Sequence, residues 1–336
     1  MTATTRVAGR SRLVDLLFRY GLLLLIGVLI VVFALLEPAF GSIANGFSIL
    51  RSIAIVTIIA CAVTLSLVVD GFDLSVGANA GLAMMLASLA LVVYRLDAPS
   101  AVAIAIFGGL VVGAMNAGLA VRLRVPDLLA TLAVLFIVQG AQLVLTGGRS
   151  VATGMRLDDG SAATGVFTDA FLWLGRGTVG PVPAAVIITV IVVGALQAFL
   201  SLTRHGRAME AVGANREAAR LAGIRVDRYR TAAYLGSGAL AALGGVVLAA
   251  QVGRGDVGAG GAYLLDAVAA ALIGLAAFGT NRPSAVGTAL GAIFMGVLLN
   301  GLTMLNLPYY AQDLVKGVVL AIALILTFAV SPTARR

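Results

Sequence analysis

The sequence predicts an all-α polytopic membrane protein with about ten transmembrane helices. Its composition is 60% hydrophobic and only 11% charged, with a mean hydropathy of +1.06. A soluble domain carries about 25% charged residues. Long apolar runs recur along the chain, each near the length of about 20 residues that a membrane helix needs. Arg residues gather in alternate segments between these runs, as they do in membrane proteins of fixed orientation.

Ten apolar runs are candidate spans within a transmembrane domain, residues 18–330, between short tails at 1–17 and 331–336. The first run is followed by Glu37 and Pro38 without a small-residue cleavage site, so we interpret it as a retained span and not as a signal peptide. The ten runs are 18–36, 50–69, 74–94, 99–120, 127–146, 182–202, 231–251, 262–279, 284–305 and 310–330.

The distribution of positive charge predicts the orientation of these spans. With the N-terminus inside, sixteen of the 23 Lys and Arg residues fall in cytoplasmic segments. Both tails and the loop 203–230 are then cytoplasmic, and the loop 147–181, with an expected interfacial helix around 167–174, is external. Since the Arg residues lie between spans, the net charge of +8 indicates topology, and no nucleic-acid partner is expected.

The loop around 204–230 is the one long polar island, with seven Arg against Glu210, Glu217 and Asp227. Its composition predicts two short helices, 207–212 and 216–221. Gly213 and Gly223 are expected to break the chain at helix ends, and Asn215 is expected to cap the second helix. A compact helical loop of this kind offers a surface that a soluble partner could bind.

Polar residues at membrane depth are the second feature, because each is costly unless it has a partner. The segment 70–77 (DGFDLSVG) joins two spans with almost no loop, so it predicts a helix break, with Asp73 or Ser75 capping the next helix. Such a break is tolerated where it is buried in protein or lines a cavity, and both interpretations stay open. Candidate pathway residues are Asp73, Ser75, Asn79, Asn116, Gln139 and Asn300.

For most of these side chains the alternative is a structural hydrogen bond between helices, and Gln142 belongs to the same group. Asp266 and Lys316 could pair, or each could face a loop.

Several chemistries lack the residues that they need. The chain has one Cys, Cys61, and one His, His205, so no internal disulfide and no Cys- or His-cluster metal site is expected. It contains no phosphate-binding loop of the GxxxxGK(S/T) type. We therefore expect no catalytic residues, cofactor or metal, and if ATP drives transport, another chain hydrolyses it.

Five stretches resemble the permease subunits of bacterial ABC importers, in their ribose/simple-sugar branch. The island sequences EAVGAN (210–215), Ala218-Ala219 and LAGI (221–224) resemble the coupling loop of that family. The branched-chain amino-acid permeases share this loop but lack a DLSVG stretch, which here is residues 73–77. The other matching stretches are 116–118 together with 126–132, Gly140 with 146–148, and YLLDAVAAA at 263–271.

The similarity runs from about residue 48 to 328, with two departures near its end. Leu264 stands where the family usually has Glu, and the segment 273–283 lacks several glycines of the family pattern and contains Arg282 and Pro283.

The resemblance implies a type II importer-like bundle in the bacterial inner membrane. Its implied partners are a second permease copy or homologue, cytoplasmic ATP-binding subunits, and a periplasmic binding protein that delivers a monosaccharide or related small solute. A nucleoside, an autoinducer-type sugar or a branched-chain amino acid stays open as substrate. The residues expected to couple to the ATPase are Glu210, Gly213, Asn215, Ala218, Ala219, Gly223 and Ile224.

Two classes of protein are the rivals. A secondary transporter would need ionisable residues within the spans, for which Asp73, Asp266 and Lys316 are the candidates. A membrane-embedded enzyme would need a catalytic or metal-binding cluster of side chains.

The topology is tested by thiol labelling in a Cys61→Ser background. Ser161→Cys should react with a membrane-impermeant reagent only from outside, and Ser201→Cys only from the cytoplasm. Labelling of Ser161→Cys from the cytoplasm alone would contradict the ten-span arrangement.

Overall fold

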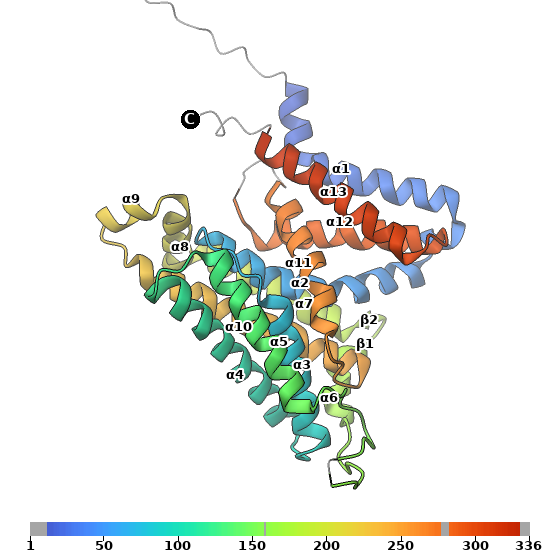
Figure 1. The fold of residues 1–336 in the computed structure, drawn as a ribbon. Coiled ribbons are helices and arrows are strands. Elements are labelled where there is room, and N and C mark those ends of the chain that lie inside the picture. Colours follow the sequence, from blue (N-terminus) through green and yellow to red (C-terminus); the bar gives the residue numbers. More distant parts are fainter. Residues whose placement is uncertain (1–11, 158, 277–281, 330–336) are drawn as a thin grey trace, which may run out of the picture.

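The computed structural model describes residues 12–157, 159–276 and 282–329, and within them every predicted apolar run forms a helix (Figure 1). The outermost parts of both tails lie outside the described residues. The ten helices are α1 (Arg12–Leu36), α2 (Ile43–Val68), α3 (Val76–Val92), α4 (Ala98–Ala117), α5 (Asp127–Thr146), α7 (Ala184–Leu202), α10 (Val226–Val252), α11 (Ala259–Ala276), α12 (Ala285–Met304) and α13 (Tyr309–Ala329).

Shorter elements connect these helices. A 3₁₀ turn, η1 (Pro38–Gly41), precedes α2, and a π-helical turn, η2 (Gly118–Arg122), extends α4. The polar island forms α8 (Arg204–Ala214) and α9 (Arg216–Leu221). The loop before α7 contains α6 (Asp169–Arg176) and the short strands β1 (Thr178–Val179) and β2 (Val182–Pro183), which pair antiparallel.

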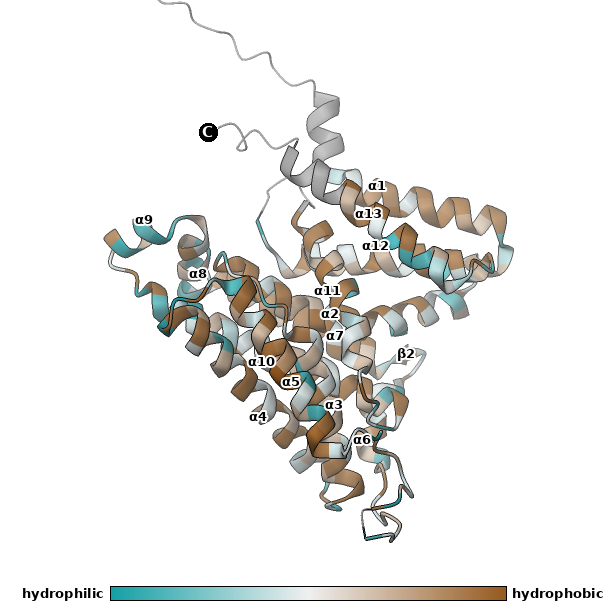
Figure 2. Ribbon diagram, viewed as in Figure 1, coloured by the Kyte–Doolittle hydropathy of each residue, from teal (hydrophilic) through white to brown (hydrophobic). Residues whose placement is uncertain are grey.

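The helices have the length and composition of a polytopic membrane protein. Among the described residues, six are long and apolar enough to cross a bilayer: α2, α4 with η2, α5, α7, α10 and α12. Three shorter apolar stretches, 20–36, 76–92 and 259–275, lie in α1, α3 and α11. Figure 2 shows hydrophobic residues along most helices and hydrophilic residues gathered on α8 and α9. The number of crossings, about ten, stays a prediction.

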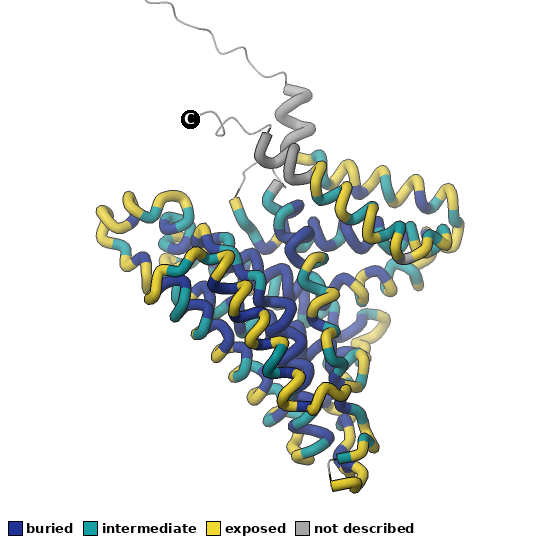
Figure 3. Tube along the Cα trace, in the orientation of Figure 1, coloured by how far each residue is buried: buried dark blue, intermediate teal, exposed yellow. Residues whose placement is uncertain are grey.

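Helix α10 is the centre of the core, and it packs against α2, α3, α4 and α6 (Figure 3). Small residues let these backbones approach closely, which is the usual basis of helix packing in membranes. Gly238 of α10 lies against the Gly109 carbonyl of α4, and Gly245 lies against the Ala80 carbonyl of α3. Side chains such as Met84 and Val246 are fully buried between them.

The helices α1, α11, α12 and α13 form the second part of the bundle, joined to the first mainly through α2 and α3. Here Lys316 Nζ lies 3.0 Å from Asp266 Oδ1 and 3.5 Å from Asp313 Oδ1. The ion pair that the sequence left open is therefore formed, and it links α13 to α11.

The described residues of the loop 147–181 form a cap on one end of the bundle (Figure 1). The expected helix is present as α6, which Thr168 caps by accepting a hydrogen bond from the Phe171 amide. Phe171 is fully buried, and Arg176 donates to the carbonyls of Gln251 and Val252 at the end of α10. In the exposed part of the loop, hydrogen bonds from Ser161 hold the pKa of the Asp159 carboxyl below its usual range.

The close packing of α3 and α10 gives a stability prediction. A side chain at Gly245 would overlap the Ala80 carbonyl, whereas Gly194 on α7 has open space around it. Gly245→Val should therefore lower the free energy of unfolding by roughly 1–3 kcal/mol or more, as overpacking does, and Gly194→Val should change it little. Thermal unfolding of the detergent-solubilised protein measures both, and equal melting temperatures would contradict this packing.

Candidate functional site

The two helices of the polar island are defined by local caps. Thr203 Oγ1 accepts a hydrogen bond from the Gly206 amide at 3.0 Å and begins α8. Asn215 Oδ1 accepts one from the Ala218 amide at 2.9 Å and begins α9. Gly223, with φ +80°, follows the end of α9 in a conformation that favours glycine. The expected cap at Asn215, the bounds of α9 and the break at Gly223 are all confirmed.

Gly213 differs from its prediction. It lies inside α8 and does not break the chain, since the helix continues to Ala214, and its φ is not among the positive values. A Cβ at this position would overlap the Val68 carbonyl and lie 3.2 Å from the Asp70 amide nitrogen. Glycine is needed here because α8 packs directly against the last residues of α2, not because the backbone turns.

Ala219 was expected to face a partner, and this expectation was wrong. It is 4% exposed and packs within a cluster that includes Leu65, Met209 and Val212. The exposed residues of α9 are Glu217, Ala218, Arg220 and Leu221, and Leu221 is 82% exposed. Asn215 and Gly223 are also exposed, and Glu210 and Ile224 are partly buried.

The predicted helix break between α2 and α3 is present. Helix α2 ends at Val68, and Asp70 has φ 55°, a left-handed conformation that Asp adopts more readily than most residues. Gly71 leaves room for the buried Tyr234 side chain, whose hydroxyl would lie 2.9 Å from a Cβ there. The break is therefore fitted closely against α10.

Asp73 lies at this break and is buried among hydrogen-bond donors. Its Oδ1 accepts from the Ser75 amide at 2.9 Å, from Ser75 Oγ at 2.6 Å and from Asn116 Nδ2 at 3.2 Å. Its Oδ2 accepts from Ser237 Oγ at 2.8 Å. Ser75, the N-cap residue of α3, makes no side-chain cap hydrogen bond. The Asp73 carboxylate thus joins the break to α4 and α10.

The remaining pathway candidates are dispersed. Asn79 Nδ2 donates to the Gly238 carbonyl at 3.0 Å, and Asn300 Oδ1 accepts from Asn45 at 3.0 Å, so both make hydrogen bonds between helices. Gln142 is buried and donates to the Ala78 carbonyl, whereas Gln139, about one turn earlier on α5, is exposed. The structure brings Asp73, Ser75 and Asn116 together and places the others elsewhere.

An ion cluster that the sequence reasoning missed lies beside the break. Arg230 Nη2 is 2.5 Å from Asp127 Oδ1, and both side chains are largely buried. Arg216 Nη2 is 3.5 Å from Asp127 Oδ2 and 3.3 Å from Asp70 Oδ2, and it also donates to the Asp70 carbonyl. A polar pocket of about 340 Å³ adjoins these groups, and Arg124, Arg220 and Asp227 also line it. The sequence signal that could have revealed this cluster was the position of Asp127 and Arg230 at the ends of apolar runs.

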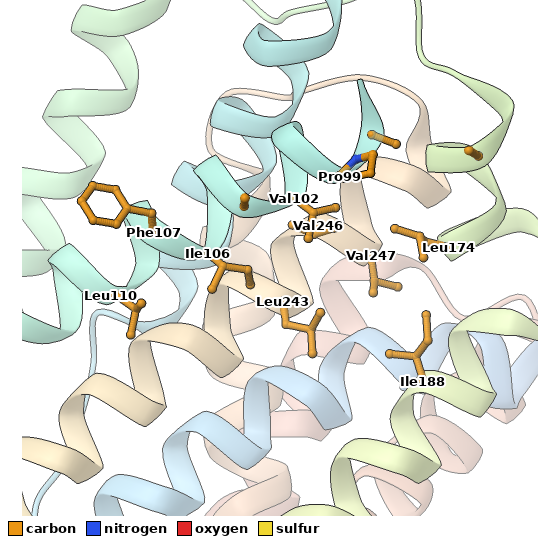
Figure 4. A pocket seen from close by; sticks show the side chains of 13 residues that line it. Pro99, Val102, Ile106, Phe107, Leu110, Leu174, Ile188, Leu243, Val246 and Val247 are labelled. Carbon is orange, nitrogen blue, oxygen red and sulfur yellow. The ribbon is translucent and has the colours of Figure 1, made fainter. Parts of the chain in front are cut away.

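A larger groove of about 890 Å³ lies between α4, α6, α7 and α10 (Figure 4). Its lining is formed by apolar side chains, such as Ile106, Leu174, Ile188 and Val247. It offers no side-chain hydrogen-bond partner to a sugar, so it is not a candidate binding site for one.

The comparisons with known proteins identify the family of this chain. Residues 45–324 match the family described as branched-chain amino acid transport system / permease component. The chain belongs to this family. Its members are transport permeases and not catalytic enzymes.

The relatives within this family include sugar permeases. The chain is 35% identical to the ribose import permease protein RbsC of Escherichia coli (strain K12) over 89% of its own length and 90% of that protein. It is 32% identical to the ribose import permease protein of Bacillus subtilis (strain 168) over 89% of each chain. It is 29% identical to the xylose transport system permease protein XylH of E. coli (strain K12) over 85% of each. No solved structure matches the chain. The expected resemblance to the ribose/simple-sugar branch is confirmed.

The contact at Gly213 can be tested by comparing substitutions at Gly213 and at its neighbour Ala214. Gly213→Val should push α8 away from the end of α2, whereas Ala214→Val, on the exposed side of the same helix, should not. Limited proteolysis of the 203–230 loop measures the difference. We expect faster cleavage only in Gly213→Val, and identical cleavage rates would show that α8 does not depend on this contact.

Proposed function

We propose that this chain is the transmembrane permease subunit of an ATP-driven importer that carries a monosaccharide across the bacterial inner membrane. The observation that carries the proposal is the match over about nine-tenths of the chain to ribose import permeases, in a protein built of apolar helices. The xylose permease extends the same substrate class to a second pentose. ATP hydrolysis is assigned to separate cytoplasmic subunits.

Helices α8 and α9 are the proposed docking surface for the ATP-binding subunit, on the cytoplasmic side with both termini. Three features support this assignment. The pair protrudes from the bundle as its most hydrophilic helical part (Figures 1 and 2). Both helices are capped, so their shape is defined before a partner binds. Leu221, with Ala218 beside it, offers an exposed apolar contact in this polar surface.

The ordered cap formed by residues 147–181 is the proposed surface for a periplasmic binding protein. It lies at the end of the bundle opposite to α8 and α9 (Figure 1). Contacts to α10 hold α6 in place, and the β1–β2 hairpin leads directly into α7. A protein that docks there would therefore contact the ends of two long helices.

A second permease copy, or a homologue, is the proposed partner within the membrane. Gln139 is exposed on α5 among side chains such as Phe136 and Val144, where contact with lipid would leave its amide unpaired. If a partner permease or a water-filled pathway lies against this face, the Gln139 amide is not left unpaired in lipid. We place Gln139 and Asn300 along the pathway. Asp73, Ser75, Asn79 and Asn116 are buried, so they would act by holding the helix break.

The uptake experiment has to distinguish sugars from other substrates, since the family description names branched-chain amino acids. The chain would be reconstituted in proteoliposomes with its ATP-binding subunits and binding protein, and uptake of labelled ribose, xylose and leucine measured with and without ATP. ATP-dependent uptake of a pentose supports the proposal. Leucine uptake alone would replace the substrate class, and uptake that needs an ion gradient but no ATP would indicate a secondary transporter.

The docking surface gives a separate prediction. Leu221→Glu places a charge in an apolar contact, and loss of such an anchor typically costs at least 2 kcal/mol of binding. Co-purification of the ATP-binding subunit should fall on the order of tenfold or more. Val179→Glu, an equally polar change on the exposed hairpin at the other end, is the control. Equal co-purification of both variants would remove α9 from the docking surface.

A further inference from the structure

The ion cluster of Asp70, Asp127, Arg216 and Arg230 has no assigned role in transport. We propose that these four residues are positioning residues that link the ATPase-docking helices to the α2–α3 break, so that movement of α9 is passed to the membrane-embedded helices. The inference rests on the proposed function, because it needs α8 and α9 to be the docking surface.

The cluster joins four elements that are far apart in the sequence. Arg216 is the first residue of α9, and Asp127 is the first residue of α5. Arg230 lies in the second turn of α10, and Asp70 lies in the break. Asp127 binds both arginines, one through each carboxylate oxygen. A displacement of α9 therefore acts on α5, on α10 and on the break at once.

Arg216 contacts two groups of Asp70 in the break. The guanidinium pairs with the Asp70 carboxylate at 3.3 Å, and it donates to the Asp70 backbone carbonyl. The second contact holds the chain itself, at a residue with φ 55°. Gly213, three residues before the start of α9, packs against Val68 and Asp70. The break is thus held by a steric contact from α8 and a polar contact from α9.

The residues of the break connect the ion cluster to helices in the interior of the bundle. Three residues beyond Asp70, the Asp73 carboxylate binds Asn116 of α4 and Ser237 of α10. The next residue, Leu74, donates its amide to Thr131 Oγ1 of α5 at 3.2 Å. Residues 70–75 therefore connect the surface of the docking helices to α4, α5 and α10 through polar contacts.

Burial decides which ion pairs can act in this way. The pair of Arg230 and Asp127 is 10% and 15% exposed, so solvent and salt screen it weakly. The pair of Arg220 and Glu217, on the outside of α9, is 59% and 70% exposed and contributes little to rigidity. The pair of Arg216 and Asp70 is 37% and 69% exposed, so its contribution depends on the hydrogen bond that Arg216 also donates to the Asp70 carbonyl. The link therefore depends on Asp127, its two arginines and this carbonyl contact, and not on the general basic charge of the loop.

The test measures sugar transported per ATP hydrolysed in proteoliposomes that contain the complete importer. Arg216→Gln and Asp127→Asn should still co-purify with the ATP-binding subunit and hydrolyse ATP. Their transport per ATP should fall on the order of tenfold, the size of a typical coupling effect between sites. Asp127→Glu keeps the charge and should recover part of the ratio. Arg228→Gln, an exposed change two residues before Arg230, is the matched control.

The outcomes separate the inference from the function on which it rests. Wild-type transport per ATP in both Arg216→Gln and Asp127→Asn would overturn the link and leave the importer intact. Loss of co-purification in these variants would overturn it too, because the residues would then serve docking. If both permease variants are themselves lost from the membrane, Asp70→Asn decides, since Asn also tolerates the left-handed conformation and removes only the carboxylate. Lower transport per ATP in Asp70→Asn would then support the link, and a wild-type ratio would overturn it. Failure of the wild-type chain to bind an ATP-binding subunit would instead reject the proposed function.

Discussion

The approach of α8 to the end of α2 is the contact on which the rest of this structure depends. Gly213 lets the two backbones meet, and Arg216, three residues later, binds Asp70 in the same segment. A hydrophilic pair of helices is thereby attached to a bundle of apolar ones at the point where the bundle has a break. Helix α8 also packs against α7 and α10, so this contact adds a direct attachment of the polar helices to the break.

The break itself persists because its buried carboxylate has hydrogen-bond partners. An unpaired carboxylate at this depth would be strongly destabilising, but Asp73 accepts hydrogen bonds from Ser75, Asn116 and Ser237. The same hydrogen bonds join α3, α4 and α10, whose backbones approach through glycines such as Gly109 and Gly245. Close packing and the hydrogen-bonded carboxylate together connect the docking helices to the interior.

Features that depend on local sequence were predictable, and features that depend on distant contacts were not. The apolar runs gave all ten long helices, and Asn215 and Gly223 marked the limits of α9, because span length and capping are local properties. Gly213 was misinterpreted since the Val68 carbonyl that it accommodates is 145 residues away in the chain. Ala219 was placed on the surface for the same reason, and the pairing of Asp127 with Arg230 joins residues 103 positions apart.

Hydrogen–deuterium exchange in the assembled importer tests the central claim most directly. Peptides that cover α8–α9 and peptides that cover residues 66–76 would be compared without nucleotide and with ATP bound. If the docking helices and the break move as one unit, ATP should change exchange in both segments over the same range of ATP concentrations. A change in α8–α9 with unaltered exchange at residues 66–76 would contradict the account.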